Sequence, residues 1–520
     1  MKMVIHKESS IGRLVLLIGA LLAVPLLVLP FYPEEAVYAP VFLAPAAFSV
    51  LFGLGILFLS GKKKEKETYR GHLYSSSMTV LAAWGYGVLA GAAPFILSKQ
   101  LTPVQALFEA VSGWTTTGLS VMDVADSSRI FLFHRSFMQF CGGLGFIMMM
   151  LIFVQEKESM NLYNAEGHPD RLLPNLGKTA RAISVMYCAF LAAGVLAYTA
   201  AGMPLFDSVN HTMCALSTGG FSTQTDSIGA YDNMRIDTIT NILMLIGTTN
   251  FAVLLLLVQG KFQRVFRVSE LRFMFAVLAA AILPVTWNLQ HTLFGGEAGE
   301  SLRQAVFNVI SALSTTGFAT MGYQEWPQMS TGILILLMLI GGGIGSTAGG
   351  LKLTRVYIMM RMTAENMKER VSSRRRVSVP AYTNAQGRQR LDGDLYRQTG
   401  SFVAAYLMIF ITGSLLLTET ADCSLTEAMF EFASALGTVG LSIGITGPSS
   451  NNATLLVEMA GMLLGRLEIF LIFIGFYCLA DRFRDSCAGK LRLPHRLCAG
   501  LFRYSQYKER KPERTKHRIL

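Results

Sequence analysis

The chain has 520 residues, of which 52% are hydrophobic and only 15% are charged, and its mean hydropathy is +0.43. This composition excludes an ordinary soluble protein and is typical of a membrane protein. The net charge of +11 does not indicate nucleic-acid binding, because the basic residues stand in short runs between apolar segments, as in cytoplasmic membrane loops. The seven cysteines lack a Cys-x-x-Cys pair, so we interpret them as packing residues.

Two apolar segments open the chain, residues 12–31 and 40–60, and each is long enough to cross a bilayer as a helix of about 20 residues. The turn between them carries Glu34 and Glu35, whereas the basic run 62–70 follows the second segment. Because Lys and Arg gather on the cytoplasmic side of membrane proteins, we expect a retained hairpin with a cytoplasmic N-terminus rather than a cleaved signal peptide.

A nine-residue pattern then recurs four times, which indicates an internal repeat. Aligned on Gly118, Gly220, Gly317 and Gly440, the copies stand roughly a hundred residues apart, and each has a threonine two residues before its glycine. Each copy follows a short apolar half-span that lies between two longer spans. These segments are expected at 77–98, 103–114 and 130–154; at 180–202, 204–217 and 236–260; at 271–290, 301–314 and 330–360; and at 399–418, 424–437 and 453–479.

The basic clusters predict that each half-span enters the membrane and returns on the outer side, because only re-entry keeps every cluster on the cytoplasmic face. The sequence thus predicts an all-α polytopic membrane protein, with a two-helix hairpin and four pseudo-repeats around one central ion pathway, and with both termini cytoplasmic. The expected domains are the hairpin with its basic loop, 1–70, pore repeats 71–178, 179–267, 268–395 with a basic linker, and 396–482, and a basic tail, 483–520.

The repeated Thr-x-Gly stretch has the composition of an ion filter. It follows a predicted short helix, and non-helical backbone at membrane depth is tolerated only where protein or water surrounds it. Glycine permits backbone angles that let carbonyls turn toward a common axis, and rings of backbone carbonyls form potassium filters. The alternative is that each glycine merely caps a helix, but four copies in matching contexts favour the filter. Its predicted residues are Thr116, Thr117, Gly118, Thr218, Gly219, Gly220, Thr315, Thr316, Gly317, Thr438, Val439 and Gly440.

Several further stretches, together with the four loops, carry a family resemblance over nearly the whole chain. They are Cys141 to Phe146, Thr320 to Pro327, Gly341 to Lys352 and Gly465 to Glu468. With them the chain resembles the pore-forming subunit of the Trk/Ktr/HKT superfamily of K+ transporters, nearest the TrkH type.

The resemblance implies K+ uptake through one pore per subunit, a homodimer in the bacterial cytoplasmic membrane, and gating by a cytosolic TrkA-like ring that binds NAD, ATP or ADP. This chain itself is expected to bind no nucleotide. In the superfamily a serine in place of the first filter glycine accompanies Na+ permeation, so the presence of Gly118 favours K+. The additional Gly219 is expected to loosen the second quarter of the ring.

A gate is expected below the filter. Six glycines between residues 341 and 350 disfavour a continuous helix, each by about 1 kcal/mol. Close helix packing is one explanation, and a movable flap, as in the family's intramembrane loop, is the other and the one we favour. Arg466 lies inside the apolar span 453–478, where a charge is a functional candidate, although an ion pair with Glu458 or Glu468 would also explain it. The predicted gate residues are Gly343, Gly345, Ser346, Thr347, Gly349, Lys352 and Arg466.

Two other functions remain open at this point. The first is a Na+- or H+-coupled secondary transporter of another monovalent cation or a small solute. Such proteins often have inverted repeats, whereas these four share one orientation. The second is an intramembrane enzyme, which would need a catalytic cluster at depth; His211 stands alone in its half-span and is expected to pack or hydrogen-bond there.

Overall fold

The computed structural model describes residues 5–59, 69–145, 176–372 and 380–467, together with residues 469, 470, 472, 473 and 475. All of these except Gly475 belong to one compact unit, Met1–Ile474. Within this described part, six helices are long and apolar enough to cross a membrane, or seven if a bent pair counts as one span. The protein is therefore a helical, polytopic membrane protein.

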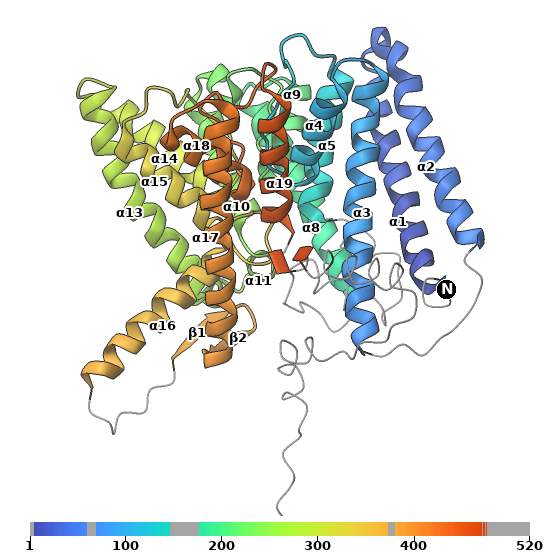
Figure 1. Ribbon diagram of the computed structural model, residues 1–520. Helices are drawn as coiled ribbons and strands as arrows, with labels where there is room; N and C mark the ends of the chain where they lie inside the picture. The colour runs from blue at the N-terminus through green and yellow to red at the C-terminus, as the bar shows by residue number, and fades with distance from the viewer. Residues whose placement is uncertain are drawn as a thin grey trace, which may run out of the picture. The chain divides into compact units, whose positions relative to one another are not determined.

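An N-terminal helical hairpin occupies the predicted place. Its first arm is α1 (Ile5–Ala23), continued by the 3-10 turn η1 (Val24–Val28), and its second arm is α2 (Ala39–Leu59), preceded by η2 (Pro33–Tyr38). The two arms pack along each other (Figure 1). Most of the basic run 62–70 and all of the tail 483–520 lie outside the described residues.

Four short helices match the predicted half-spans, and each lies in the chain between two further helices. The short helices are α4 (Pro103–Trp114), α9 (Leu205–Leu216), α14 (Ala298–Ser314) and α18 (Leu425–Gly437). The helices before them are α3 (Tyr69–Leu97), α8 (Leu176–Ala200), α13 (Ser269–Thr292) and α17 (Gly393–Ala421), and those after them are α5 (Arg129–Leu144), α10 (Met234–Thr248), α15 (Gln328–Ile340) and α19 (Asn452–Arg466).

Connecting elements complete the described part. They are η3 (Ser227–Tyr231), α11 (Phe251–Val258), α12 (Phe262–Val265), α16 (Leu353–Val371) and a hairpin of β1 (Ala381–Asn384) and β2 (Gly387–Arg390). The two strands pair antiparallel, with Ala381 opposite Arg390.

Local sequence explains where two of the short helices begin. Thr102 with Gln105 and Ser424 with Glu427 form capping boxes, which satisfy the free N–H groups of the first turn of α4 and α18. Pro204 stands at the N-cap of α9, where the segment expected at 204–217 begins, whereas α14 begins at Ala298, before the segment expected at 301–314, with Glu297 at its N-cap.

Packing around the short helices is cyclic. Each contacts the helix before it and the helix after it, and it also contacts the helix that ends the preceding unit: α5 packs on α9, α10 on α14, α15 on α18, and α19 on α4. The core lies here, since Phe108, Phe307 and Phe430, each ten residues before a loop glycine, are fully buried. The last contact closes the circle and brings the ends of all four short helices together.

Three of the predicted second spans contain a helix end or a bend that the sequence did not predict. The span expected at 130–154 has its helix end at Leu144, because Gly145 adopts a φ of 78°. The span expected at 236–260 bends by 114° between α10 and α11. The span expected at 453–479 has its helix α19 end at Arg466, where Leu467 is extended. Arg466 is thus at the C-terminus of a helix within the predicted span, and residues 469, 470, 472, 473 and 475 beyond it are again helical. The break expected in residues 341–350 is confirmed, since α15 ends at Ile340 and α16 begins at Leu353.

Candidate functional site

The four loops share one backbone conformation. Their threonines Thr116, Thr218, Thr315 and Thr438 have φ values of 56°, 52°, 56° and 50°, and their glycines Gly118, Gly220, Gly317 and Gly440 have φ values of 98°, 75°, 80° and 100°. A left-handed conformation costs a non-glycine residue about 1–2 kcal/mol. Four such residues at equivalent places indicate that the loop geometry is imposed by its function or surroundings.

Hydrogen bonds turn the loop N–H groups back toward the short helices. The residue between threonine and glycine donates to the carbonyl five residues earlier in all four loops, at 2.9 Å from Thr117, 2.8 Å from Gly219, 3.0 Å from Thr316 and 2.8 Å from Val439. In two loops the next N–H donates to a serine hydroxyl of the same helix, from Gly118 to Ser112 at 3.0 Å and from Gly440 to Ser434 at 2.9 Å. These bonds occupy the N–H groups of the loops and do not involve the carbonyls of the same residues.

The loops form a closed ring. A Cβ atom added at Gly118 would lie 2.2 Å from the carbonyl oxygen of Gly219, and one added at Gly220 would lie 2.1 Å from that of Thr316. The same atom would lie 1.9 Å from the Val439 oxygen if added at Gly317, and 2.3 Å from the Thr117 oxygen if added at Gly440. Each glycine therefore abuts a carbonyl of the next loop along the chain, and the fourth abuts the first. No side chain fits at any of the four positions without displacing an oxygen.

One cavity of about 510 Å³ reaches all four loop glycines. Its wall also carries the hydroxyl residues Ser120, Ser222, Thr320 and Ser442, which follow the glycines. The cavity is thus lined by polar groups from all four loops, as an aqueous entrance requires.

A polar side chain nine residues before each glycine holds the stretch that follows it. Glu109 accepts a hydrogen bond from Ser120 at 3.0 Å, and Glu431 accepts one from Ser442 at 2.7 Å. His211 lies 2.9 Å from the Ser222 hydroxyl, and Asn308 donates to Thr320 at 3.1 Å. All four side chains are fully buried. The prediction that His211 forms a hydrogen bond is confirmed, and the shared offset of nine residues is a signal that the sequence analysis missed.

A buried ion pair accompanies the first loop. Arg135 of α5 lies 2.7 Å from Glu109, with side chains 2% and 0% exposed. The guanidinium also donates to Ser120 at 3.0 Å and stacks 4.2 Å from the ring centre of Phe221 in the second loop. A buried charge is costly unless it is paired, so Glu109 and Arg135 depend on each other.

The glycine-rich segment 341–352 lies directly against the filter-like loops. The Thr218 hydroxyl donates to that of Thr347 at 3.1 Å, and the Gly349 N–H donates to the Thr315 hydroxyl at 2.8 Å. A Cβ atom on Gly349 would lie 2.1 Å from the Thr438 hydroxyl oxygen. The segment therefore contacts three of the four loop threonines.

Arg466 fastens this segment to α5. Its guanidinium donates to the carbonyl of Thr347 at 2.6 Å and to that of Gly142 at 2.5 Å. Lys352 donates to the Ala348 carbonyl, and the Ser346 hydroxyl donates to Gly343 at 2.7 Å. The predicted gate residues are thus brought together. Glu458 is engaged elsewhere, with Thr446, and Glu468 lies outside the described residues.

The other side of the segment 341–352 contacts the bend between α10 and α11. Asn250, at the bend, donates to the Ile344 carbonyl at 2.5 Å, and the Phe251 N–H donates to Gly345 at 3.0 Å. Glu270 of α13 accepts the Ile344 N–H at 2.8 Å. Asn250 and Glu270 were not among the predicted residues, and nothing in their local sequence marks them.

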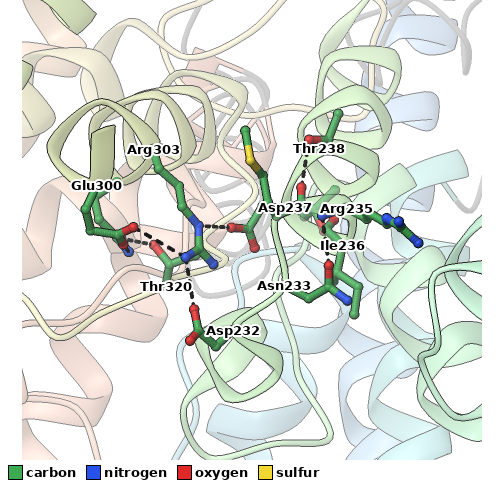
Figure 2. Close-up of polar contacts among 12 residues, drawn as sticks. Asp232, Asn233, Arg235, Ile236, Asp237, Thr238, Glu300, Arg303 and Thr320 are labelled. Atoms are coloured by element: carbon green, nitrogen blue, oxygen red, sulfur yellow. Dashed lines mark hydrogen bonds and ion pairs between the residues drawn. The ribbon is translucent and has the colours of Figure 1, made fainter. Parts of the chain in front are cut away.

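At the start of α14, Arg303 is surrounded by carboxylates (Figure 2). Its side chain lies 2.7 Å from Asp237, 2.9 Å from Asp232 and 3.4 Å from Glu300. Arg303 lies within the half-span expected at 301–314, and its positive charge is paired with these carboxylates. The cluster also ties α14 to α10.

Comparisons with known proteins agree with this architecture. The family model of the TrkH cation transport proteins matches residues 40–483. The Trk system potassium uptake protein TrkH of Salmonella typhimurium is 30% identical over 90% of this chain and 97% of its own length. TrkI of Halomonas elongata, also a Trk system potassium uptake protein, is 30% identical over 73% of this chain and 78% of its own.

Among solved structures, the crystal structure of the potassium transporter TrkH from Vibrio parahaemolyticus matches with a TM-score of 0.78 at 26% identity, over 90% of this chain and 98% of that one. The family match extends over most of the chain, from the second arm of the hairpin through all four loops. The chain belongs to the TrkH family, whose members are cation transport proteins and not enzymes.

Proposed function

We propose that this chain takes up potassium across a bacterial membrane through a filter built from the four loops. The observation that carries the proposal is the closed ring, in which the carbonyls of Thr117, Gly219, Thr316 and Val439 each abut a glycine of the preceding loop. A ring of backbone carbonyls replaces the hydration shell of K+ in potassium filters. Relatives that match 90% of the chain are named potassium uptake proteins, which supports K+ as the transported ion.

The proposed pathway is a single pore surrounded by four pseudo-repeats. Each repeat supplies a span, a re-entrant short helix and a second, interrupted span. The cyclic packing of α5 on α9, α10 on α14, α15 on α18 and α19 on α4 supports this arrangement. The cavity of about 510 Å³ would be the entrance to the filter.

The segment 341–352 is the proposed gate. Its contacts with Thr218, Thr315 and Thr438 close the side of the ring opposite the entrance. Opening requires Arg466 to release the Thr347 carbonyl, and withdrawal of this guanidinium would also remove a positive charge that opposes cations. Deleting residues 343–348 should leave an unregulated, leaky pore. Flux that is unchanged and still regulated after the deletion would refute the gate.

The proposed partners follow from the family. We expect a homodimer with both termini cytoplasmic and a cytosolic TrkA-like ring that binds NAD, ATP or ADP and acts on the gate. The names of the relatives, which describe components of Trk systems, support a multi-subunit assembly. Native mass spectrometry of the purified chain tests the dimer, and flux measured with and without a cognate ring subunit tests the regulation.

The decisive experiment is uptake by a bacterial strain that lacks its own K+ transporters. Expression of the chain with a cognate ring subunit should restore growth at low K+, and K+ uptake should exceed Na+ uptake. Growth that is not restored, despite protein in the membrane, would contradict the proposal.

One observation favours a second candidate, proton-coupled transport. Glu431 and Glu458 are fully buried, and both lie within hydrogen-bond distance of the Thr446 hydroxyl, at 2.5 Å and 2.9 Å. Two carboxylates this close repel each other when both are charged, so the pair is suited to holding a proton. Uptake into proteoliposomes under an imposed pH gradient distinguishes the two candidates, because uptake without coupling depends on the K+ gradient and membrane voltage alone.

A further inference from the structure

The ring of loop carbonyls is not fourfold symmetric, because one of its oxygens is bonded to a side chain. Gln139 of α5 is fully buried, and its amide nitrogen donates to the Gly219 carbonyl at 2.5 Å. Its amide oxygen accepts the N–H of Phe221 at 3.1 Å. Gln139 therefore forms hydrogen bonds with the second loop on both sides of Gly220. Among the described residues, no protein donor is bonded to the corresponding carbonyls of Thr117, Thr316 and Val439.

The position of Gln139 also explains why residue 219 is a glycine. Its φ lies outside the left-handed region, so its backbone does not require glycine. A Cβ atom at this position would lie 2.4 Å from Cδ, 2.5 Å from Oε1 and 2.9 Å from Nε2 of Gln139. The amide group occupies the space that a side chain at residue 219 would need, so the additional glycine leaves no gap in the ring.

In the other three loops the equivalent residue supplies its own side chain. The hydroxyl of Thr117 lies 2.8 Å from that of Thr115, and the hydroxyl of Thr316 lies 2.7 Å from that of Ser314. Val439 packs a methyl group beside Gly437. Three loops are thus supported by their own residue, and the second is supported by a glutamine from the preceding unit.

We infer that Gln139 is a positioning residue for ion selectivity, which sets the place and the negative potential of the Gly219 carbonyl. The inference rests on the proposed function, since it gives that carbonyl a role in the filter. An oxygen that accepts an amide proton is held in place and offers less negative charge to a cation. The second quarter of the ring should therefore be a weaker but more rigid ligand than the others.

The test replaces the support that Gln139 gives to the second loop with a side chain at residue 219, as in the other three loops. Gln139→Leu removes both hydrogen bonds and frees the Gly219 carbonyl, and the ratio of K+ to Na+ uptake should fall about tenfold, which corresponds to about 1.4 kcal/mol in relative affinity. Gly219→Thr alone should also lower the ratio, because its side chain collides with the amide. In Gln139→Ala combined with Gly219→Thr, the threonine enters the vacated space, and the ratio should be closer to that of the wild type than the ratio of Gln139→Ala alone or of Gly219→Thr alone.

The matched control is His134→Leu. His134 is also buried on α5 and lies 3.0 Å from a backbone carbonyl, that of Gly91, but this carbonyl belongs to α3 and not to a loop. This variant should keep the wild-type ratio, with uptake normalised to folded protein in the membrane.

The outcomes separate this inference from the proposed function. If the wild type itself does not prefer K+, the proposed filter fails. If the wild type prefers K+ and folded Gln139→Leu keeps the same ratio, the role of Gln139 is refuted. Should Gln139→Leu not fold, the double variant decides: a ratio closer to the wild type than that of Gly219→Thr supports the inference, and a ratio no higher than that of Gly219→Thr overturns it.

Discussion

The contact between Gly118 and the next loop provides the sharpest test of the ring. In Gly118→Ala the new Cβ would lie 2.2 Å from the Gly219 oxygen, and relief to about 3.0 Å, the closest ordinary approach to a Cβ, moves that oxygen by about 0.8 Å. For about half a unit charge at an effective dielectric of about 20, moving an oxygen from about 3.0 to about 3.8 Å from a cation removes about 0.6 kcal/mol. We therefore expect K+ uptake to fall about threefold at limiting K+, from this one ligand alone.

Gly202→Ala is the matched control for this substitution. Gly202 has the same φ as Gly118, 98°, but nothing lies within 4 Å of an added Cβ. Both variants carry the same backbone cost of about 1–2 kcal/mol, and only Gly118→Ala displaces a carbonyl. K+ and Na+ uptake, each normalised to the amount of folded protein in the membrane, provides the comparison. Equal uptake by the two variants would refute the assignment of the Gly219 oxygen to the ion path.

Three further predictions concern the gate and the buried charges. Arg466→Gln removes two charge-assisted hydrogen bonds, to the carbonyls of Thr347 and Gly142, each worth about 1.5–3 kcal/mol. Rb+ efflux from proteoliposomes without a ring subunit should therefore rise at least about tenfold, and an unchanged efflux would contradict the gate. Glu109→Gln leaves Arg135 buried without its charged partner and should cost about 3–5 kcal/mol of stability, measured as a lower melting temperature in detergent. A melting temperature equal to that of the wild type would show that the ion pair is dispensable. Arg303→Met should cost about 1–3 kcal/mol of stability, because Asp237, which is 5% exposed, loses its hydrogen-bond donor. Arg397→Met, in a pair that is 61% and 45% exposed, should cost less than about 1 kcal/mol, and similar losses of stability in both variants would argue against burial as the cause.

The elements that the sequence predicts well are those specified by neighbouring residues. The half-span expected at 103–114 coincides with α4, because Thr102 and Gln105 form a local capping box. The break after Ile340 was likewise predictable, since its glycines disfavour helix within the segment itself.

The features that sequence reasoning missed depend on partners far along the chain. The bend at Asn250 contains no glycine or proline, and it is stabilised by the carbonyl of Ile344, 94 residues away. Gln139 and Gly219 are 80 residues apart, so a single sequence offers no periodicity that joins them. Arg466 was expected below the filter, and its contact with Thr347 agrees with this expectation, but the helix end at which it stands was not predictable from an uninterrupted apolar segment.

The order of contacts around the ring has a consequence for how the proposed filter can change. In a pore made of four identical subunits, one substitution alters all four quarters at once, whereas here each loop is encoded separately and meets two different neighbours. A side chain added at one loop glycine therefore perturbs one junction and leaves three intact. This division allows the quarters to specialise one at a time, and the bond from Gln139 to Gly219 is a case in which a single quarter has acquired its own support.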